Sequence, residues 1–137
     1  LYDLLVDIGF INKTVNIQVY NRYSADMEMI SAVICAGLFP CVGQCKQEGI
    51  FTKDDGRIYI SPSSVNAGVW VFPQPYLVFS EKVKTSTIKI RDCTNISDYA
   101  ILMFGGTLTR SQSGKAIEML GGYLHFSASE RTLKLIQ

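Results

Sequence analysis

Hydrophobic positions at the start of the chain recur with the period of an α-helix. The stripe, with spacings of three and four residues, consists of Leu1, Leu4, Leu5 and Ile8. Gly9 follows at the point where such a helix would end. A helix with one apolar face needs a partner to pack against, so the stripe predicts the end of a helical-bundle domain. Residues 12–23 are polar without a clear period, and we expect a linker there.

A second helix is expected after this linker. Ser24 is a candidate N-cap, and Asp26 and Glu28 would lie near the positive end of the helix dipole. Gly37 and Pro40 would end the helix. The expected apolar face consists of Met27, Ile30, Val33 and Ile34. A stripe at this spacing usually packs in a protein core.

From residue 41 onward the pattern changes to short strands separated by turn residues. The Asp-Asp-Gly sequence at 54–56 predicts a hairpin turn with an acidic tip in solvent. A long strand is expected over 76–83, followed by a turn at 84–86. In the strand after it, isoleucines alternate with polar and basic residues over 87–91. This alternation predicts one face toward the core and one face that presents cations to solvent.

The last third of the chain predicts a short helix and a further hairpin. Ser97 can cap a helix that runs through Phe104 and ends at the glycine pair that follows. Two more glycines, Gly121 and Gly122, are typical of a two-residue loop between adjacent strands. The predicted fold is therefore mainly β with flanking helices. We expect a five-stranded barrel of the OB type, preceded by the end of a helical bundle.

Composition supports one compact domain. Of the 137 residues, 47% are hydrophobic and 18% are charged, which favours a packed core over disorder. The longest mostly apolar run, residues 32–42, is shorter than the roughly 18–20 residues of a membrane span, so no membrane partner is expected. No cationic leader precedes an apolar stretch. Because the chain begins without methionine and ends in mid-pattern, we interpret it as a fragment of a longer protein.

The four cysteines are expected to be reduced thiols that pack as small apolar side chains. They are Cys35, Cys41, Cys45 and Cys93. Their spacing differs from the close pairs of a zinc site, and a single histidine, His125, does not complete a ligand set. A disulfide is the alternative interpretation. Reduced cysteines indicate an intracellular protein.

Catalytic groups are hard to assemble from this sequence. No glycine-rich loop followed by Lys and Ser or Thr is present to hold a nucleotide phosphate. A Ser-His-Asp or Cys-His set would depend on His125, which alternates with apolar residues on a predicted strand. The adjacent Asp54 and Asp55 would diverge in most turns. We therefore predict no catalytic residue, no metal site and no cofactor in this chain.

Charge is distributed unevenly along the chain. Residues 1–55 carry four basic and seven acidic side chains, whereas residues 82–115 carry six basic and two acidic ones. A polyanion would therefore meet the second half of the chain first. The predicted nucleic-acid contacts are Lys82, Lys84, Thr85, Ser86 and Arg91, with Ser63 and Ser64 as a second group. The basic side chains would attract phosphates, and the hydroxyls would donate hydrogen bonds to phosphate or ribose.

Alternative interpretations of these residues stay open. Arg91 and Asp92 can form a structural ion pair, and Lys89 can be plain surface. Tyr76 and Tyr123 are candidate stacking platforms, but tyrosine in a strand more often packs in the core. Trp70, in the apolar stretch 69–72, can pack on the barrel or on a neighbouring domain.

Five sequence blocks occur in series over residues 28–126, and together they resemble the C-terminal region of DEAH-box RNA helicases. They are residues 33–40, 60–66, 76–86, 90–94 and 99–106. Residues 1–11 also resemble the end of the helical bundle that precedes the barrel in that family. The chain departs from the family at Ser61, where many members carry histidine, and at 121–123, where a tryptophan is frequent.

The resemblance implies a domain organisation and a function. Residues 1–23 would be the end of the helical-bundle domain and a linker, and residues 24–137 the OB-fold domain with the start of a C-terminal tail. Such a domain would line the RNA channel, hold single-stranded RNA and couple its position to the motor. ATP and magnesium would bind the motor domains of the parent helicase, which are not in this chain.

Several partners follow from the same resemblance. They are single-stranded RNA, with DNA left open, the helicase core of the same chain, and a regulator protein. Nucleus and cytoplasm fit equally. The competing hypothesis is a protein-docking barrel that binds the helicase core or a regulator through Trp70 and Phe72.

Overall fold

The computed structural model describes residues 1–135, and the chain divides into two compact units between Ile30 and Ser31. The first unit holds helix α1 (Tyr2–Asp7), which confirms the first predicted helix and is followed by Gly9 with φ of 85°. A second short helix, α2 (Ile17–Tyr20), lies in the stretch that we expected to be a linker. It is one turn long, and the Asn16 side chain caps it by accepting a hydrogen bond from the Gln18 N–H (3.0 Å). A single capped turn has no hydrophobic period to reveal it.

Helix α3 (Met27–Leu38) confirms the second predicted helix, but its cap and its buried face differ from the prediction. The Asp26 carboxylate, not Ser24, accepts hydrogen bonds from the Glu28 and Met29 N–H groups, both at 3.1 Å. The buried positions are Ala32 and Cys35, whereas Val33 is 61% exposed. The predicted face was therefore partly wrong, because small side chains that permit close packing were passed over in favour of bulky ones.

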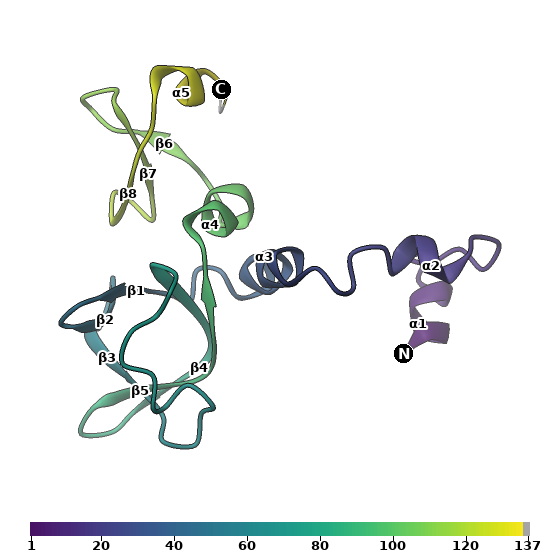
Figure 1. The fold of residues 1–137 in the computed structure, drawn as a ribbon, viewed down its shortest axis with the longest axis horizontal. Helices are drawn as coiled ribbons and strands as arrows, with labels where there is room; N and C mark the ends of the chain where they lie inside the picture. The colour runs from purple at the N-terminus through teal and green to yellow at the C-terminus, as the bar shows by residue number, and fades with distance from the viewer. Residues whose placement is uncertain (136–137) are drawn as a thin grey trace. The chain divides into compact units, whose positions relative to one another are not determined.

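Five strands form a closed barrel in the order β1-β2-β3-β5-β4, which confirms the predicted five-stranded OB barrel (Figure 1). The strands are β1 (Val42–Lys46), β2 (Gly49–Thr52), β3 (Gly56–Ile60), β4 (Tyr76–Lys84) and β5 (Ile88–Ile96). Only β3 and β5 pair in parallel, and the other four pairings are antiparallel. The predicted turn at 54–56 joins β2 to β3, and its Gly56 has φ of 67°. Residues 85–87 join β4 to β5.

The barrel interior is filled by apolar side chains from four of its strands. They are Ile50, Ile58, Leu77, Phe79, Ile90 and Cys93. Regular alternation would place Ile90 and Cys93 on opposite faces of β5, but Asp92 between them has φ of 50°. Arg91 and Asp92 are consequently both exposed, and the residues on either side both point inward.

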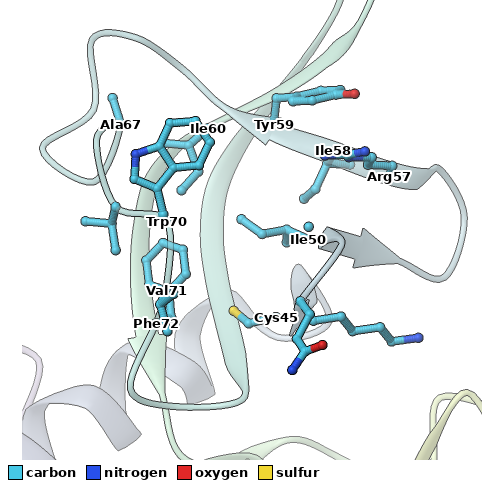
Figure 2. A pocket seen from close by; sticks show the side chains of 14 residues that line it. Cys45, Ile50, Arg57, Ile58, Tyr59, Ile60, Ala67, Trp70, Val71 and Phe72 are labelled. Atoms are coloured by element: carbon cyan, nitrogen blue, oxygen red, sulfur yellow. The ribbon is translucent and has the colours of Figure 1, made fainter.

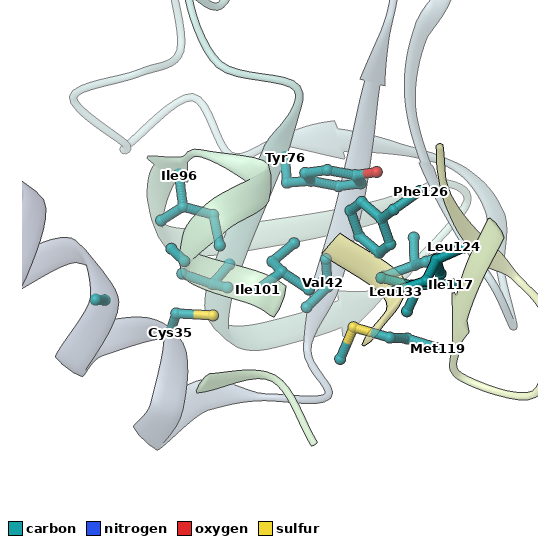
Figure 3. Close-up of a cluster of buried hydrophobic side chains, with 13 residues drawn as sticks. Cys35, Val42, Tyr76, Ile96, Ile101, Ile117, Met119, Leu124, Phe126 and Leu133 are labelled. Carbon is teal, nitrogen blue, oxygen red and sulfur yellow. The ribbon is translucent and has the colours of Figure 1, made fainter. Parts of the chain in front are cut away.

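A second core lies on the outer side of the barrel, and Figure 3 shows its side chains converging from the helices and from the C-terminal sheet. The elements that cover it are α4 (Asp98–Phe104), β6 (Thr109–Arg110), β7 (Ala116–Met119), β8 (Leu124–Ser127) and α5 (Glu130–Leu135). The predicted cap of α4 is confirmed, since the Ser97 hydroxyl accepts a hydrogen bond from the Ala100 N–H (3.3 Å). The last hairpin is also confirmed, but its loop covers four residues, 120–123, instead of two.

The cysteines are free thiols among the described residues, as predicted. Cys35 and Cys93 are buried, and Cys41 and Cys45 are partly buried. No group of three histidine, cysteine or acidic side chains in the described part of the chain is arranged to hold a metal ion. None of the helices in residues 1–135 is long and apolar enough to cross a bilayer.

Candidate nucleic-acid interface

The predicted contact residues lie on the β4–β5 hairpin and in the loop after β3. Lys82 and Lys84 are on β4, Thr85 and Ser86 are in the turn, and Arg91 is on β5. We call these five residues the hairpin surface. Ser63 and Ser64 lie in the loop between β3 and β4.

The structure brings Lys82 and Lys84 together, as predicted, but both ammonium groups contact the carboxylate of Asp55. Both ammonium groups contact Asp55 in the β2–β3 turn, Lys82 through a short hydrogen bond and Lys84 at 3.2 Å. The Asp55 side chain is only 5% exposed, so the expected acidic tip in solvent is wrong for this residue. The hydrogen bond from Lys82 is the main cause that holds the pKa of the Asp55 carboxyl below its usual value, and Lys84 acts in the same direction.

Arg91 projects from the opposite side of the hairpin. It is paired with Glu81 across the ladder, whereas Lys82 is paired with the buried Ile90, so Arg91 and Lys82 lie on different faces. The Arg91 guanidinium is 3.6 Å from the Glu81 carboxylate, and both side chains are about half exposed. The structural ion pair that we considered for Arg91 is thus formed with Glu81 and not with Asp92.

The predicted hydroxyl groups mostly stabilise their own loops. The Thr85 hydroxyl donates to the Thr87 carbonyl (3.1 Å), and the Ser63 and Ser61 hydroxyls are 2.9 Å apart. The Ser64 hydroxyl accepts from the Asn66 N–H (3.2 Å). Thr85, Ser86 and Ser63 are nevertheless exposed, so they can also meet a ligand.

A groove of about 540 Å³ lies between the first three strands and the loop that follows β3. Figure 2 shows Trp70 and Phe72 on the loop side of the groove, with Arg57, Ile58 and Tyr59 on β3. The Trp70 ring is 96% exposed. No aspartate or glutamate is among the residues that line this groove.

Two cations lie over aromatic rings on the outer face of the same strands. The Arg57 guanidinium is 5.3 Å from the centre of the Tyr59 ring, and the Lys46 ammonium is 5.4 Å from the centre of the Phe51 ring. Phe51 and Arg57 are cross-strand partners, which places these pairs side by side. Within the described residues, neither Lys46 nor Arg57 forms a salt bridge.

Sequence reasoning missed this surface, although one signal was present. Arg57 and Tyr59 are two residues apart on a strand, so they share a face. The contribution of Lys46 and the position of Trp70 opposite them depend on strand pairing and on the path of a loop. Of the two tyrosines considered for stacking, Tyr76 is buried with its ring 5.8 Å from that of Phe126, and Tyr123 is partly buried against the same core. Both therefore pack in the second core, as interpreted.

Cys45 lines the groove as a partly buried free thiol. Burial, with a smaller effect from Cys93, raises the pKa of the Cys45 thiol to about 11. The thiolate is the nucleophilic form, so this shift disfavours covalent chemistry at neutral pH.

Comparison with known proteins places this geometry in a family. The model of the oligonucleotide/oligosaccharide-binding (OB)-fold family matches residues 30–108. The chain is 62% identical over 139 aligned residues to the DExH-box ATP-dependent RNA helicase DExH1 of Arabidopsis thaliana, an alignment that covers 98% of this chain. It is 36% identical over 129 residues to DExH3 of the same plant (91% of this chain) and 34% identical over 114 residues to the human ATP-dependent DNA/RNA helicase DHX36 (77% of this chain).

The chain spans 14%, 10% and 11% of the lengths of these three relatives, respectively. The closed five-stranded barrel and the matched residues agree with the resemblance found in the sequence blocks. The chain belongs to the OB-fold family found in the C-terminal region of DEAH- and DExH-box RNA helicases.

Proposed function

We propose that this chain is the single-stranded RNA-binding accessory domain of an ATP-dependent DExH-box helicase. The observation that carries the proposal is the groove, which is lined by the cations Lys46 and Arg57 and by the exposed rings of Tyr59 and Trp70. Within the described residues, neither cation forms a salt bridge. Proteins that hold single strands combine a cationic track for the phosphates with aromatic rings on which bases stack. The groove has both components on one face.

Each component has a separate role. Trp70 and Tyr59 present ring faces to unstacked bases, and Lys46 and Arg57 attract the phosphates between them. Stacking accepts every base because every base has a π-face. Binding at this groove is therefore expected to tolerate many sequences, and DNA as well as RNA.

The hairpin surface forms a second contact region in this proposal. In OB folds, oligonucleotides cross the face of the second and third strands between the β1–β2 and β4–β5 loops. Here, Lys46 ends β1 at the first of these loops, and Thr85 and Ser86 lie in the second. Lys82, Lys84 and Arg91 flank that second loop, and Ser63 and Ser64 follow β3.

For the parent protein we propose a role by analogy with the helicases that this chain resembles. The domain would line the RNA channel of the helicase and couple the position of the strand to the motor. ATP and magnesium would be bound by motor domains outside this chain. The parent protein would act in the nucleus or the cytoplasm. The helicase core and a regulator protein are the proposed protein partners.

Fluorescence anisotropy with labelled oligouridine at low and moderate salt tests the proposal. Binding should weaken with salt, because phosphate contacts release counterions. It should also weaken when Arg57 is replaced by glutamine. Affinity that is independent of salt, or unchanged in Arg57→Gln, would rule out the groove as an RNA site.

A second candidate function rests on a different observation. Trp70 and Val71 are 96% and 84% exposed on one loop, and exposed apolar groups of this kind also occur at protein contacts. The chain would then be a docking barrel for the helicase core or a regulator. A pull-down with the helicase core, comparing the wild type with Trp70→Ala, separates the two. Strong capture without measurable RNA binding favours docking.

A further inference from the structure

One acidic residue and two lysines that are far from it in the sequence form a cluster of charges beside the β2–β3 turn. Asp55 lies in the β2–β3 turn, and Lys82 and Lys84 lie on β4, 27 and 29 positions later. We call them the Asp55 cluster. Thr52 holds the carboxylate in place, since its hydroxyl accepts from the Asp55 N–H (3.2 Å) and donates to a carboxylate oxygen (3.4 Å).

The three side chains differ in their access to solvent. Asp55 is 5% exposed, whereas the side chains of Lys82 and Lys84 are 31% and 65% exposed. A ligand can therefore approach the ammonium groups from outside while the carboxylate contacts them from inside. Because the Asp55 carboxylate offsets one of the two lysine charges, an approaching ligand meets a net charge of +1 instead of +2.

A phosphate diester and a carboxylate bind the ammonium group of a lysine in the same way. Each offers two oxygens that share a negative charge and accept charge-assisted hydrogen bonds. Both lysines donate to the carboxylate in the free chain. A phosphate must share or replace these contacts, and it is repelled by the carboxylate at short range.

We propose that Asp55 is a built-in competitor for nucleic-acid phosphate, which lowers the affinity of the hairpin surface until a bound strand draws Lys82 and Lys84 away. This inference rests on the proposed function and adds a regulated phosphate site to it. The groove binds the strand first, because no described carboxylate forms a salt bridge with Lys46 or Arg57. The hairpin then adds contacts after a strand is in place.

The substitution Asp55→Asn tests the competitor. It removes the charge and keeps the shape and a hydrogen-bonding oxygen for Thr52. Affinity for oligouridine at low salt should rise about fivefold, as expected for removing one like charge near a phosphate at the surface. The dependence of log affinity on log salt should steepen by roughly 0.7, the value for one added phosphate contact of a single strand.

Two controls isolate the effect. Asp54→Asn removes the same charge from the neighbouring exposed position and should change affinity by less than Asp55→Asn does. In a chain with Lys82→Gln and Lys84→Gln, Asp55→Asn should have no more effect than Asp54→Asn. Circular dichroism and thermal unfolding confirm that each variant is folded.

If Asp55→Asn does not fold, a measurement on the wild-type protein tests the same proposal. Carbon NMR can follow the titration of the Asp55 carboxyl with and without oligouridine. If the lysines turn to phosphate, the carboxyl loses the partners that lower its pKa, so its pKa rises on binding.

The outcomes separate this inference from the function on which it depends. Unchanged or weaker binding by folded Asp55→Asn, or an Asp55 pKa that stays lowered in the complex, overturns the competitor alone if Arg57→Gln still weakens binding. No binding by any variant overturns the proposed function as well.

Discussion

The groove and the hairpin surface both carry cations, but they differ in what surrounds those cations. On the hairpin, Lys82 and Lys84 contact Asp55, and Arg91 contacts Glu81. Lys46 and Arg57 line the groove and lie over the rings of Phe51 and Tyr59, and no carboxylate is among the described residues that line the groove. A cation over a ring keeps its charge available to a phosphate, whereas a cation in a salt bridge is partly neutralised. Whether a basic residue is available to bind phosphate therefore depends more on the group that its side chain contacts than on its position in a basic segment of the sequence.

The largest expected effect on the affinity for oligouridine comes from removing the Trp70 ring from the groove. Trp70→Ala should weaken oligouridine binding by about 1–3 kcal/mol, or roughly 5- to 150-fold, if one base stacks on this ring. The salt dependence should not change, because no charge is lost. Val65→Ala, at a fully exposed position of the same loop, is the control in the anisotropy measurement. Equal affinities for the two variants would leave the groove without a stacking role.

The next effect tests the cations of the groove. The double substitution of Lys46→Gln with Arg57→Gln should lower affinity severalfold at low salt and reduce the salt slope by roughly 0.7 for each lost phosphate contact. Arg22→Gln is a matched control, because Arg22 also lies over a tyrosine ring, at 5.0 Å, but in the first unit. A slope that stays the same in the double variant would contradict the comparison.

A third test uses pH to measure the pairing on the hairpin. The pKa of Asp55 is lowered in the folded chain, mainly by Lys82, so its pairing stabilises the fold above the carboxyl's unfolded pKa. That contribution is lost as pH falls through the folded pKa. The difference in unfolding free energy between wild type and Asp55→Asn should therefore shrink from pH 6 to pH 3 in urea titrations. A constant difference between wild type and Asp55→Asn across this pH range would mean that the pairing of Asp55 with the lysines is weak.

The smallest effect is expected at Arg91. Its ion pair with Glu81 is half exposed, and such pairs contribute about 0–1 kcal/mol. Arg91→Gln should change the melting temperature little and should weaken oligouridine binding less than Arg57→Gln does. A loss as large as that of Arg57→Gln would show that the hairpin, and not the groove, dominates the interface.

Local signals predicted most of the fold. The turn at 54–56, the cap at Ser97 and the long strands β4 and β5 were all found where composition and period indicated them. The errors arose where local signals are weak. Helix α2 is a single capped turn, and the buried face of α3 uses Ala32 and Cys35, which a search for bulky side chains overlooks.

The candidate site was harder to predict, for a physical reason. Periodicity assigns a side chain to one face of its own strand, but it does not say what lies opposite. The reversal at Asp92 in β5 is also invisible to a two-residue period. Lys82 and Arg91 looked like parts of one cationic face, although the register of the hairpin places them on different faces.

What the amino-acid sequence determined by itself was the type and order of most of the elements, with α2, β6 and α5 as exceptions, and through the series of blocks the helicase family. What only the tertiary structure decided was which charges meet. Asp55 reaches Lys82 across 27 positions, and Trp70 faces Arg57 across a groove, because strand register and loop path bring them together. Helix caps and turns depend on neighbours in the chain, whereas ion pairs and binding surfaces depend on neighbours in space.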